Sequence, residues 1–143
     1  MPPKDDFDLH AFLPYLLNQA AEASSLGFQV SYKGRYGMLR TDWRVLFHLG
    51  IHGRMTAKDI GERAKIHKTK VSRAVQRLAD RRFLTRERDE SDRRSEFLEL
   101  TQAGQAAYRD LRAIAQEYEA RLTARFSAED TALLKRLLVE LAR

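Results

Sequence analysis

The sequence predicts a mainly α-helical protein of the α+β class with a single β-hairpin. Apolar residues recur at helical spacing over most of the 143 residues. Segments 84–88 and 96–100 alternate imperfectly between apolar and polar residues and flank a charged stretch, as the two strands of a hairpin do. Capping residues and glycines separate the predicted helices.

The N-terminal segment predicts a helix from Leu9, which Pro14 either begins or kinks. Residues 25–38 mix glycine with aromatic residues, and we assign them to no element. A short helix follows, for which Thr41 is the predicted N-cap and Gly53 the predicted stop.

Two short helices come next. Thr56 and Asp59 form a capping-box-like pair that opens a helix ending near residue 64. A four-residue break separates it from a second helix over residues 69–81. Two short helices joined by a tight turn match the helix-turn-helix plan, in which the second helix enters the major groove of DNA.

A helical wheel divides the 69–81 helix into two faces. One face is apolar and predicted to be buried, and consists of Val71, Ala74, Val75 and Leu78. The opposite face is polar, with Thr69, Ser72, Arg73 and Gln76 at its centre and Lys70 and Arg77 at its flank.

The polar face carries groups that read base edges. Arginine pairs with guanine, glutamine with adenine, and short hydroxyls with either base, while a flanking lysine suits phosphate. Any amphipathic helix exposes polar residues, but glutamate is common on such helices and none occurs between Lys65 and Arg86. This composition favours DNA binding.

The positive charge is concentrated in one segment. The chain has 26 Lys and Arg and 20 Asp and Glu, a net charge of +6. Residues 58–94 hold 13 Lys and Arg and 7 Asp and Glu, so this segment carries the whole excess. A solvated basic face is the alternative, but one patch with all the excess charge favours binding to a polyanion.

The hairpin tip ends in Arg93 and Arg94. A two-stranded ribbon can lie along a duplex and place an arginine in the minor groove, where the potential is most negative. Asp92 would be a poor neighbour for phosphate unless it were paired. We therefore hypothesise an ion pair between Asp92 and an arginine of the 69–81 helix, with Arg77 as the candidate.

The C-terminal part predicts two further helices. Thr101 is the expected N-cap of a long helix that ends near Phe126, and Ser127 with Asp130 opens the last one. Apolar stripes thus lie at both ends of the chain. They either pack on each other within one chain or pair with a second chain, and the frequency of two-fold dimers favours a homodimer.

Several classes of function are disfavoured. The chain lacks cysteine, which excludes disulfides and thiolate zinc sites, and it has no apolar run long enough to span a bilayer. No segment resembles a signal peptide, so we expect a cytoplasmic protein without membrane contact. No phosphate-binding glycine loop or nucleophile elbow is present, and we expect neither enzyme activity nor a cofactor. His48 and His52 lie four residues apart, but without a nearby carboxylate they are weak metal ligands.

Four segments together resemble the MarR-type winged helix regulators. "DRRSEFLELTQAG" is similar to that family's wing and following helix start, and "KTKVSRAVQRLADRRFLTR" to its recognition helix and the strand after it. "RTDWRVLFHL" and "FSAEDTALLKRLL" resemble its segment before the helix-turn-helix and its closing helix. The resemblance covers nearly the whole chain and is most specific between residues 56 and 104.

The resemblance implies a winged helix-turn-helix fold with long terminal dimerisation helices. Residues 37–102 would form the DNA-binding lobe, and residues 1–36 and 103–143 the dimerisation helices. Such a homodimer binds double-stranded DNA at a pseudo-palindromic operator. It usually represses neighbouring genes until a small, often aromatic effector releases it. An architectural DNA-binding protein that ignores ligands is the alternative.

The resemblance also implies roles for individual residues. Arg94 would be the wing-tip residue in the minor groove. From its own place at the turn of the hairpin, we expect Arg93 to contact phosphate. Arg82 stands where the family often has glycine, which implies a different turn or an added phosphate contact. The major-groove set would be Ser72, Arg73, Gln76 and Arg77, with Thr56 and Lys58 near the backbone phosphates. We also expect Lys68, Thr69 and Lys70 to contact DNA. An effector pocket would use Tyr32, Tyr36, Trp43 and Phe47, with Arg40 or Arg44 for an acid group, although Trp43 and Phe47 could instead be core.

Overall fold

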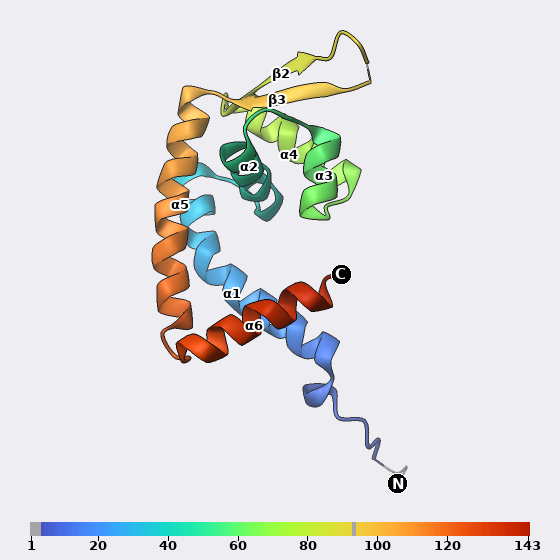
Figure 1. Ribbon diagram of the computed structural model, residues 1–143, viewed down its shortest axis with the longest axis vertical. Coiled ribbons are helices and arrows are strands. Elements are labelled where there is room, and N and C mark those ends of the chain that lie inside the picture. Colours follow the sequence, from blue (N-terminus) through green and yellow to red (C-terminus); the bar gives the residue numbers. More distant parts are fainter. Residues whose placement is uncertain (1–3, 93) are drawn as a thin grey trace.

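The computed structural model describes residues 4–92 and 94–143 and is mainly helical, as predicted (Figure 1). A short 3-10 helix, Leu9–Ala11, comes first. The α-helices are α1 (Leu13–Tyr36), α2 (Arg40–His52), α3 (Ala57–Ala64), α4 (Lys68–Asp80), α5 (Gln102–Thr123) and α6 (Ala128–Leu141). The strands are β1 (Met55–Thr56), β2 (Leu84–Arg88) and β3 (Glu96–Leu100).

The three strands form an antiparallel sheet in the order β1-β3-β2. The predicted hairpin is confirmed, with Leu84 opposite Leu100 and Arg88 opposite Glu96. Strand β1 was not predicted, because two residues are too short to show an alternating pattern. It pairs Met55 with Leu98 and thereby joins the wing to the start of α3.

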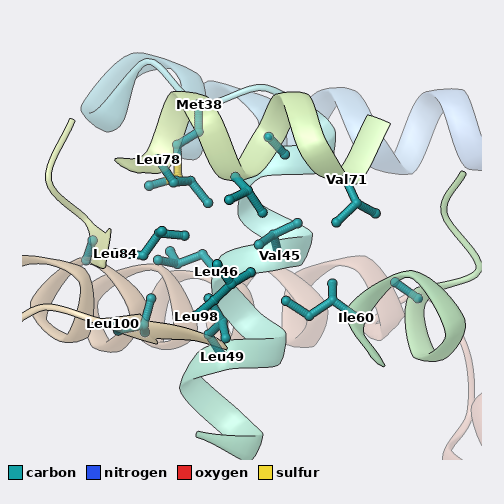
Figure 2. Packing of buried hydrophobic residues seen from close by; sticks show 14 of the residues in the cluster. Met38, Val45, Leu46, Leu49, Ile60, Val71, Leu78, Leu84, Leu98 and Leu100 are labelled. Carbon is teal, nitrogen blue, oxygen red and sulfur yellow. The ribbon is translucent and has the colours of Figure 1, made fainter. Parts of the chain in front are cut away.

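The core lies under the sheet, between α2, α4 and the first half of α5 (Figure 2). Val45, Leu46 and Leu49 project from α2 at helical spacing and are fully buried. The apolar stripe of α4 meets them, and Leu98 of β3 closes the cluster. Each such side chain contributes about 1.5–3 kcal/mol through burial.

Helix α1 continues through the segment that the sequence left unassigned. Phe28 and Tyr32 are buried on one face of α1, and this packing outweighs the low helix propensity of the glycines beside them. Pro14 stands in the first turn, where proline begins a helix without disturbing it. Gly37 ends the helix with φ of 63°, and a side chain there would overlap the guanidinium of Arg81.

The start of α2 corrects one prediction. Thr41 is not the N-cap, because the helix already begins at Arg40 and Leu39 occupies the capping position. Leu39 has no side-chain acceptor, but the Asp42 carboxylate accepts a 2.9 Å hydrogen bond from the Leu39 N–H. The predicted stop at Gly53 is confirmed.

The caps of the last two helices are confirmed. Thr101 Oγ1 accepts the Gly104 N–H of α5 at 3.1 Å, and Ser127 Oγ accepts the Asp130 N–H of α6 at 3.0 Å. Gly104 also lies so close to the turn between α4 and β2 that a side chain at this position would overlap the Phe83 carbonyl. The helix start is therefore locked against the base of the wing.

The two ends of the chain leave apolar surface uncovered. Helix α6 buries none of its residues, although Leu134, Leu137 and Leu138 recur on it at helical spacing. The first half of α1 likewise exposes Leu13 and Leu16. No helix of the described chain is long and apolar enough to cross a membrane.

Candidate nucleic-acid interface

Helices α3 and α4 form the predicted helix-turn-helix. Thr56 and Asp59 make a capping box at the start of α3, with Thr56 Oγ1 accepting the Asp59 N–H at 3.1 Å. Lys65 ends α3 in the left-handed region, with φ of 56°, and turns the chain toward α4. His67 Nδ1 then caps α4 by accepting the Thr69 N–H at 3.2 Å.

The two faces of α4 lie as the helical wheel predicted. The stripe from Val71 to Leu78 is buried, and it fixes the helix on the core. The opposite face is exposed and presents Lys68, Thr69, Lys70, Ser72, Arg73 and Gln76. Lys58 is exposed on the neighbouring helix α3, whereas Thr56 is half-buried at its start.

Arg77 does not have the partner that the sequence suggested. Its Nε and Nη2 donate to Asp42 at 2.9 and 2.7 Å, and Asp42 as a residue is only 2% exposed. The hypothesised pair with Asp92 is therefore wrong. The partner of Arg77 lies in α2. Sequence distance alone could not predict this, because it does not determine which carboxylate faces a given arginine in the fold. Asp42 thus joins the start of α2 to the last turn of α4.

A second network joins α4 to the wing. Arg86 of β2 donates to the Gln76 side-chain oxygen at 2.8 Å and to Glu96 of β3 at 2.7 Å. The amide nitrogen of Gln76 donates to Asp80 at 2.7 Å. Both ends of the Gln76 amide are therefore held in the free protein, and Arg86 sets the wing against α4.

The wing tip is organised by short polar contacts. Asp92 accepts the backbone N–H of Arg94 at 3.1 Å, and this contact shapes the turn that presents the exposed Arg94 side chain. Hydrogen bonds from the Ser91 hydroxyl and backbone N–H hold the pKa of Asp89 below its ordinary value. The predicted phosphate contact of Arg93 lies outside the described residues.

Arg82 occupies the position at which the MarR-type pattern often has glycine, and its backbone conformation shows how the turn is kept. Its φ is 63°, the left-handed region in which glycine is favoured and arginine is rare. The chain therefore keeps the turn between α4 and β2, with a side chain in the strained position. Its carbonyl accepts the Thr101 hydroxyl at 2.7 Å, and this bond ties the turn to the start of α5.

A cavity of about 240 Å³ opens between α1 and the first turns of α2. Phe28 and Trp43 form an edge-to-face pair in its wall, with ring centroids 5.1 Å apart. Its lining consists of Ser25, Phe28, Tyr32, Arg40, Trp43 and Arg44. Four of the six residues predicted for an effector pocket are thus brought together, and Ser25 and Phe28 are additions.

Two arginines give this cavity a positive character. Arg44 is half-buried, and its burial, with the charge of Arg40 as a second cause, lowers its pKa below the ordinary value. Arg44 Nη2 also donates to the carbonyl of Ala64 at 2.7 Å. Arg40 is exposed and only loosely paired with Glu22, at 3.7 Å.

Tyr36 and Phe47 do not line the cavity. Tyr36 donates its hydroxyl to Asp110 at 2.6 Å, and burial together with this hydrogen bond raises its pKa to about 12. Phe47 packs edge-to-face on Tyr108 of α5. Both side chains therefore join α1 and α2 to α5.

The histidine pair is not part of a larger cluster. His48 Nδ1 is 2.7 Å from the Arg44 carbonyl, and its ring lies 6.1 Å from that of His52. Among residues 4–92 and 94–143, no group of three or more potential metal ligands occurs.

Known proteins are similar in sequence to the DNA-binding lobe, and one of them is similar over most of the chain. Residues 36–95 match the model of the MarR family. The homoprotocatechuate degradative operon repressor of Escherichia coli is 28% identical over 132 residues, which cover 92% of this chain and 88% of the repressor.

Solved structures extend the likeness to three dimensions. A probable transcriptional regulator from Pseudomonas aeruginosa superposes with a TM-score of 0.82 at 25% identity, covering 94% of this chain and 99% of that one. NadR in complex with 4-hydroxyphenylacetate gives a TM-score of 0.77 at 26% identity, over 100% of this chain and 99% of that chain. The DNA-binding lobe therefore matches the MarR family model over residues 36–95, and nearly the entire chain shares the winged helix-turn-helix fold of transcriptional regulators.

Proposed function

We propose that this regulator is a homodimeric, sequence-specific DNA-binding repressor that an aromatic acid releases from its operator. The observation that carries the proposal is the outer face of α4. It is exposed, basic and free of glutamate, and it lies beside a wing. An ion pair between the partly exposed Arg77 and the buried Asp42 holds the helix in place.

The DNA contacts are assigned by position on this surface. Ser72, Arg73 and Gln76 face the major groove, and Arg94 at the wing tip reaches the minor groove. Gln76 exchanges its bonds with Arg86 and Asp80 for a base edge when DNA binds. Phosphate contacts come from Thr56, Lys58, Lys68, Thr69 and Lys70. Arg93, which lies outside the described residues, is assigned to phosphate from the sequence alone.

Arg77 has a different role from the one first expected. Because its guanidinium is committed to Asp42, it supports the recognition helix and does not read a base. A residue that holds α4 in register can still affect affinity strongly, since base contacts require precise placement of the helix.

Dimerisation follows from the uncovered apolar stripes. Helix α6 and the first half of α1 expose leucines that a single chain leaves in water, for example Leu137, which is 50% exposed. A second copy that covers both stripes would bury them and set two recognition helices on one face of the duplex. We assign residues 1–36 and 103–143 to this interface and residues 37–102 to the DNA-binding lobe.

The cavity suits a small aromatic acid. Its walls are aromatic, and Arg40 and Arg44 lie within it, so that a ring would stack on Trp43 while a carboxylate pairs with a guanidinium. NadR was solved with 4-hydroxyphenylacetate, a ligand of this class. We propose no catalytic role for the site and place the protein in the cytoplasm, where its DNA is.

Selection from a random duplex library, followed by fluorescence anisotropy across a salt series, tests the proposal. The selected duplex should bind at least ~10³-fold more tightly than unrelated DNA. Equal affinity for both would contradict the proposal and support the architectural alternative.

The single tryptophan provides a direct test of the cavity. Trp43 is the only tryptophan in the chain and lies in the cavity wall, so its fluorescence should respond to a bound ring. Titration with 4-hydroxyphenylacetate, benzoate and their uncharged amides should give saturable changes for the acids alone. An equal response to the amides would contradict recognition of an acid group.

A further inference from the structure

One side chain belongs both to the cavity and to the helix-turn-helix. Arg44 lines the cavity beside Trp43, and its Nη2 donates to the Ala64 carbonyl at 2.7 Å. Ala64 is the buried last residue of α3, directly before the left-handed Lys65 that begins the turn. A single guanidinium thus spans the distance from the cavity to the turn.

The hydrogen bond from Arg44 supplies the Ala64 carbonyl with a donor that the helix itself does not provide. The last carbonyls of a helix have no partner within the helix, so they depend on outside donors. The turn has a second outside contact, because Lys65 Nζ donates to the carbonyl of Ala142 just after α6. The segment between α3 and α4 is therefore held by the cavity wall on one side and by the end of the last helix on the other.

A carboxylate in the cavity would compete for the same guanidinium. A charged acceptor forms a hydrogen bond about twice as strong as a neutral carbonyl does, and it can take two parallel N–H groups of one arginine. The half-buried setting of Arg44 strengthens such a bond, and Arg40 adds attraction for an anion. An anion that takes the Nη2 group now bonded to Ala64 binds best when Arg44 has turned away from Ala64, and such a difference in affinity shifts a conformational equilibrium.

We infer that Arg44 is the positioning residue that links the cavity to DNA binding. An aromatic carboxylate in the cavity takes Arg44 from the Ala64 carbonyl, and the freed turn no longer holds α3 and α4 in the DNA-binding arrangement. The inference rests on the proposed function, since it concerns how the ligand of that cavity releases DNA.

The test compares Arg44→Met with Arg40→Met. Both variants remove a cavity arginine and keep an unbranched side chain, but only Arg44 contacts the helix-turn-helix in the structure. Hydrogen exchange of amides 60–68 is measured for each ligand-free variant, and for the wild type with and without 4-hydroxyphenylacetate. Affinity for the selected duplex is measured on the same samples.

Arg44→Met should exchange about tenfold faster across the turn without any ligand, in the pattern that the ligand produces in the wild type. It should also bind the duplex at least about tenfold more weakly than Arg40→Met does. Arg40→Met should keep the wild-type exchange at the turn. Two controls exclude general unfolding. Circular dichroism should show that Arg44→Met keeps its helices. The variant Arg44→Lys retains one donor group, and its turn should exchange at an intermediate rate.

Wild-type exchange at the turn in Arg44→Met, or equal effects of the two variants, would overturn the inference. This result is distinct from failure of the proposed function. A wild-type protein that prefers no duplex would contradict the proposed function, whereas the ligand-free exchange comparison would still decide whether Arg44 holds the turn.

Discussion

Replacing Asp42 by asparagine removes the charge at the centre of the contact between α2 and α4 and keeps the shape of the side chain. In the wild type, all the partners of this carboxylate are donors, namely the Leu39 N–H at 2.9 Å and two groups of Arg77 at 2.7 and 2.9 Å. An asparagine amide has only one oxygen, so its NH₂ group must face either Leu39 or Arg77, donor against donor.

The magnitude follows from the burial of the two partners. Breaking a fully buried ion pair costs about 3–5 kcal/mol. The Arg77 side chain is 38% exposed, so part of its hydration returns and the upper range does not apply. Loss of one charge-assisted hydrogen bond, about 2 kcal/mol, is the better measure. For a chain of this size the melting temperature should fall by about 4–8 °C.

Urea unfolding at one fixed protein concentration measures the change, since dimer stability depends on concentration. Asp42→Asn, Arg77→Gln and the double variant form a cycle in which the double variant should cost about 1 kcal/mol less than the sum of the single ones. Glu87→Gln, which breaks an exposed pair with Arg54, is the matched control and should cost below about 0.5 kcal/mol. An Asp42→Asn cost as small as the control, or a strictly additive cycle, would refute the reasoning.

Three further predictions concern the wing, the start of α2 and Tyr36. Arg94→Ala should weaken binding of the selected duplex about tenfold and leave the sedimentation of the protein unchanged, while unmoved affinity would make the wing tip structural only. Leu39→Thr should raise the free energy of unfolding by about 1 kcal/mol, because it supplies the missing N-cap acceptor at an exposed position. An unchanged free energy in urea unfolding would contradict this prediction. The pKa of Tyr36 is raised to about 12, so its bond to Asp110 stabilises the protein fully below pH 10 and is lost as the pH rises through 12. The stability advantage of the wild type over Tyr36→Phe should therefore shrink between pH 10 and 12, and a constant difference in urea unfolding would contradict this assignment.

The local signals in the sequence predicted the elements well. Thr56, Thr101 and Ser127 each cap the helix that was expected, because capping depends on neighbours three residues away. The two strands of the hairpin have the predicted bounds, since their pattern and the charged tip between them are also local. The helical wheel of α4 is right for the same reason.

Errors arose where distant contacts decide the outcome. Residues 25–38 contain three glycines, two of which lie within α1, where the buried side chains of Phe28 and Tyr32 pack on the rest of the fold. Thr41 looked like a cap, but the N–H of Leu39 is satisfied from inside the helix by Asp42. The sequence places Arg77 closer to Asp92 than to Asp42, yet the fold brings α2 beneath α4.

The site was predicted in its residue types more than in its connections. The basic, glutamate-free face of α4 was visible because helical periodicity places its residues together. The bonds from Arg86 to Gln76 and from Arg44 to Ala64 were not, since each joins elements whose relative positions no local pattern determines.

Hydroxyl-radical footprinting of the selected duplex, combined with sedimentation of the complex, tests the central claim most directly. Two copies of the chain should bind one duplex and protect two half-sites with centres one helical turn apart, ~34 Å, or a multiple of it. The footprint should fade when an aromatic acid that changes the fluorescence of Trp43 is added. One chain per duplex, or protection without paired half-sites, would contradict the account.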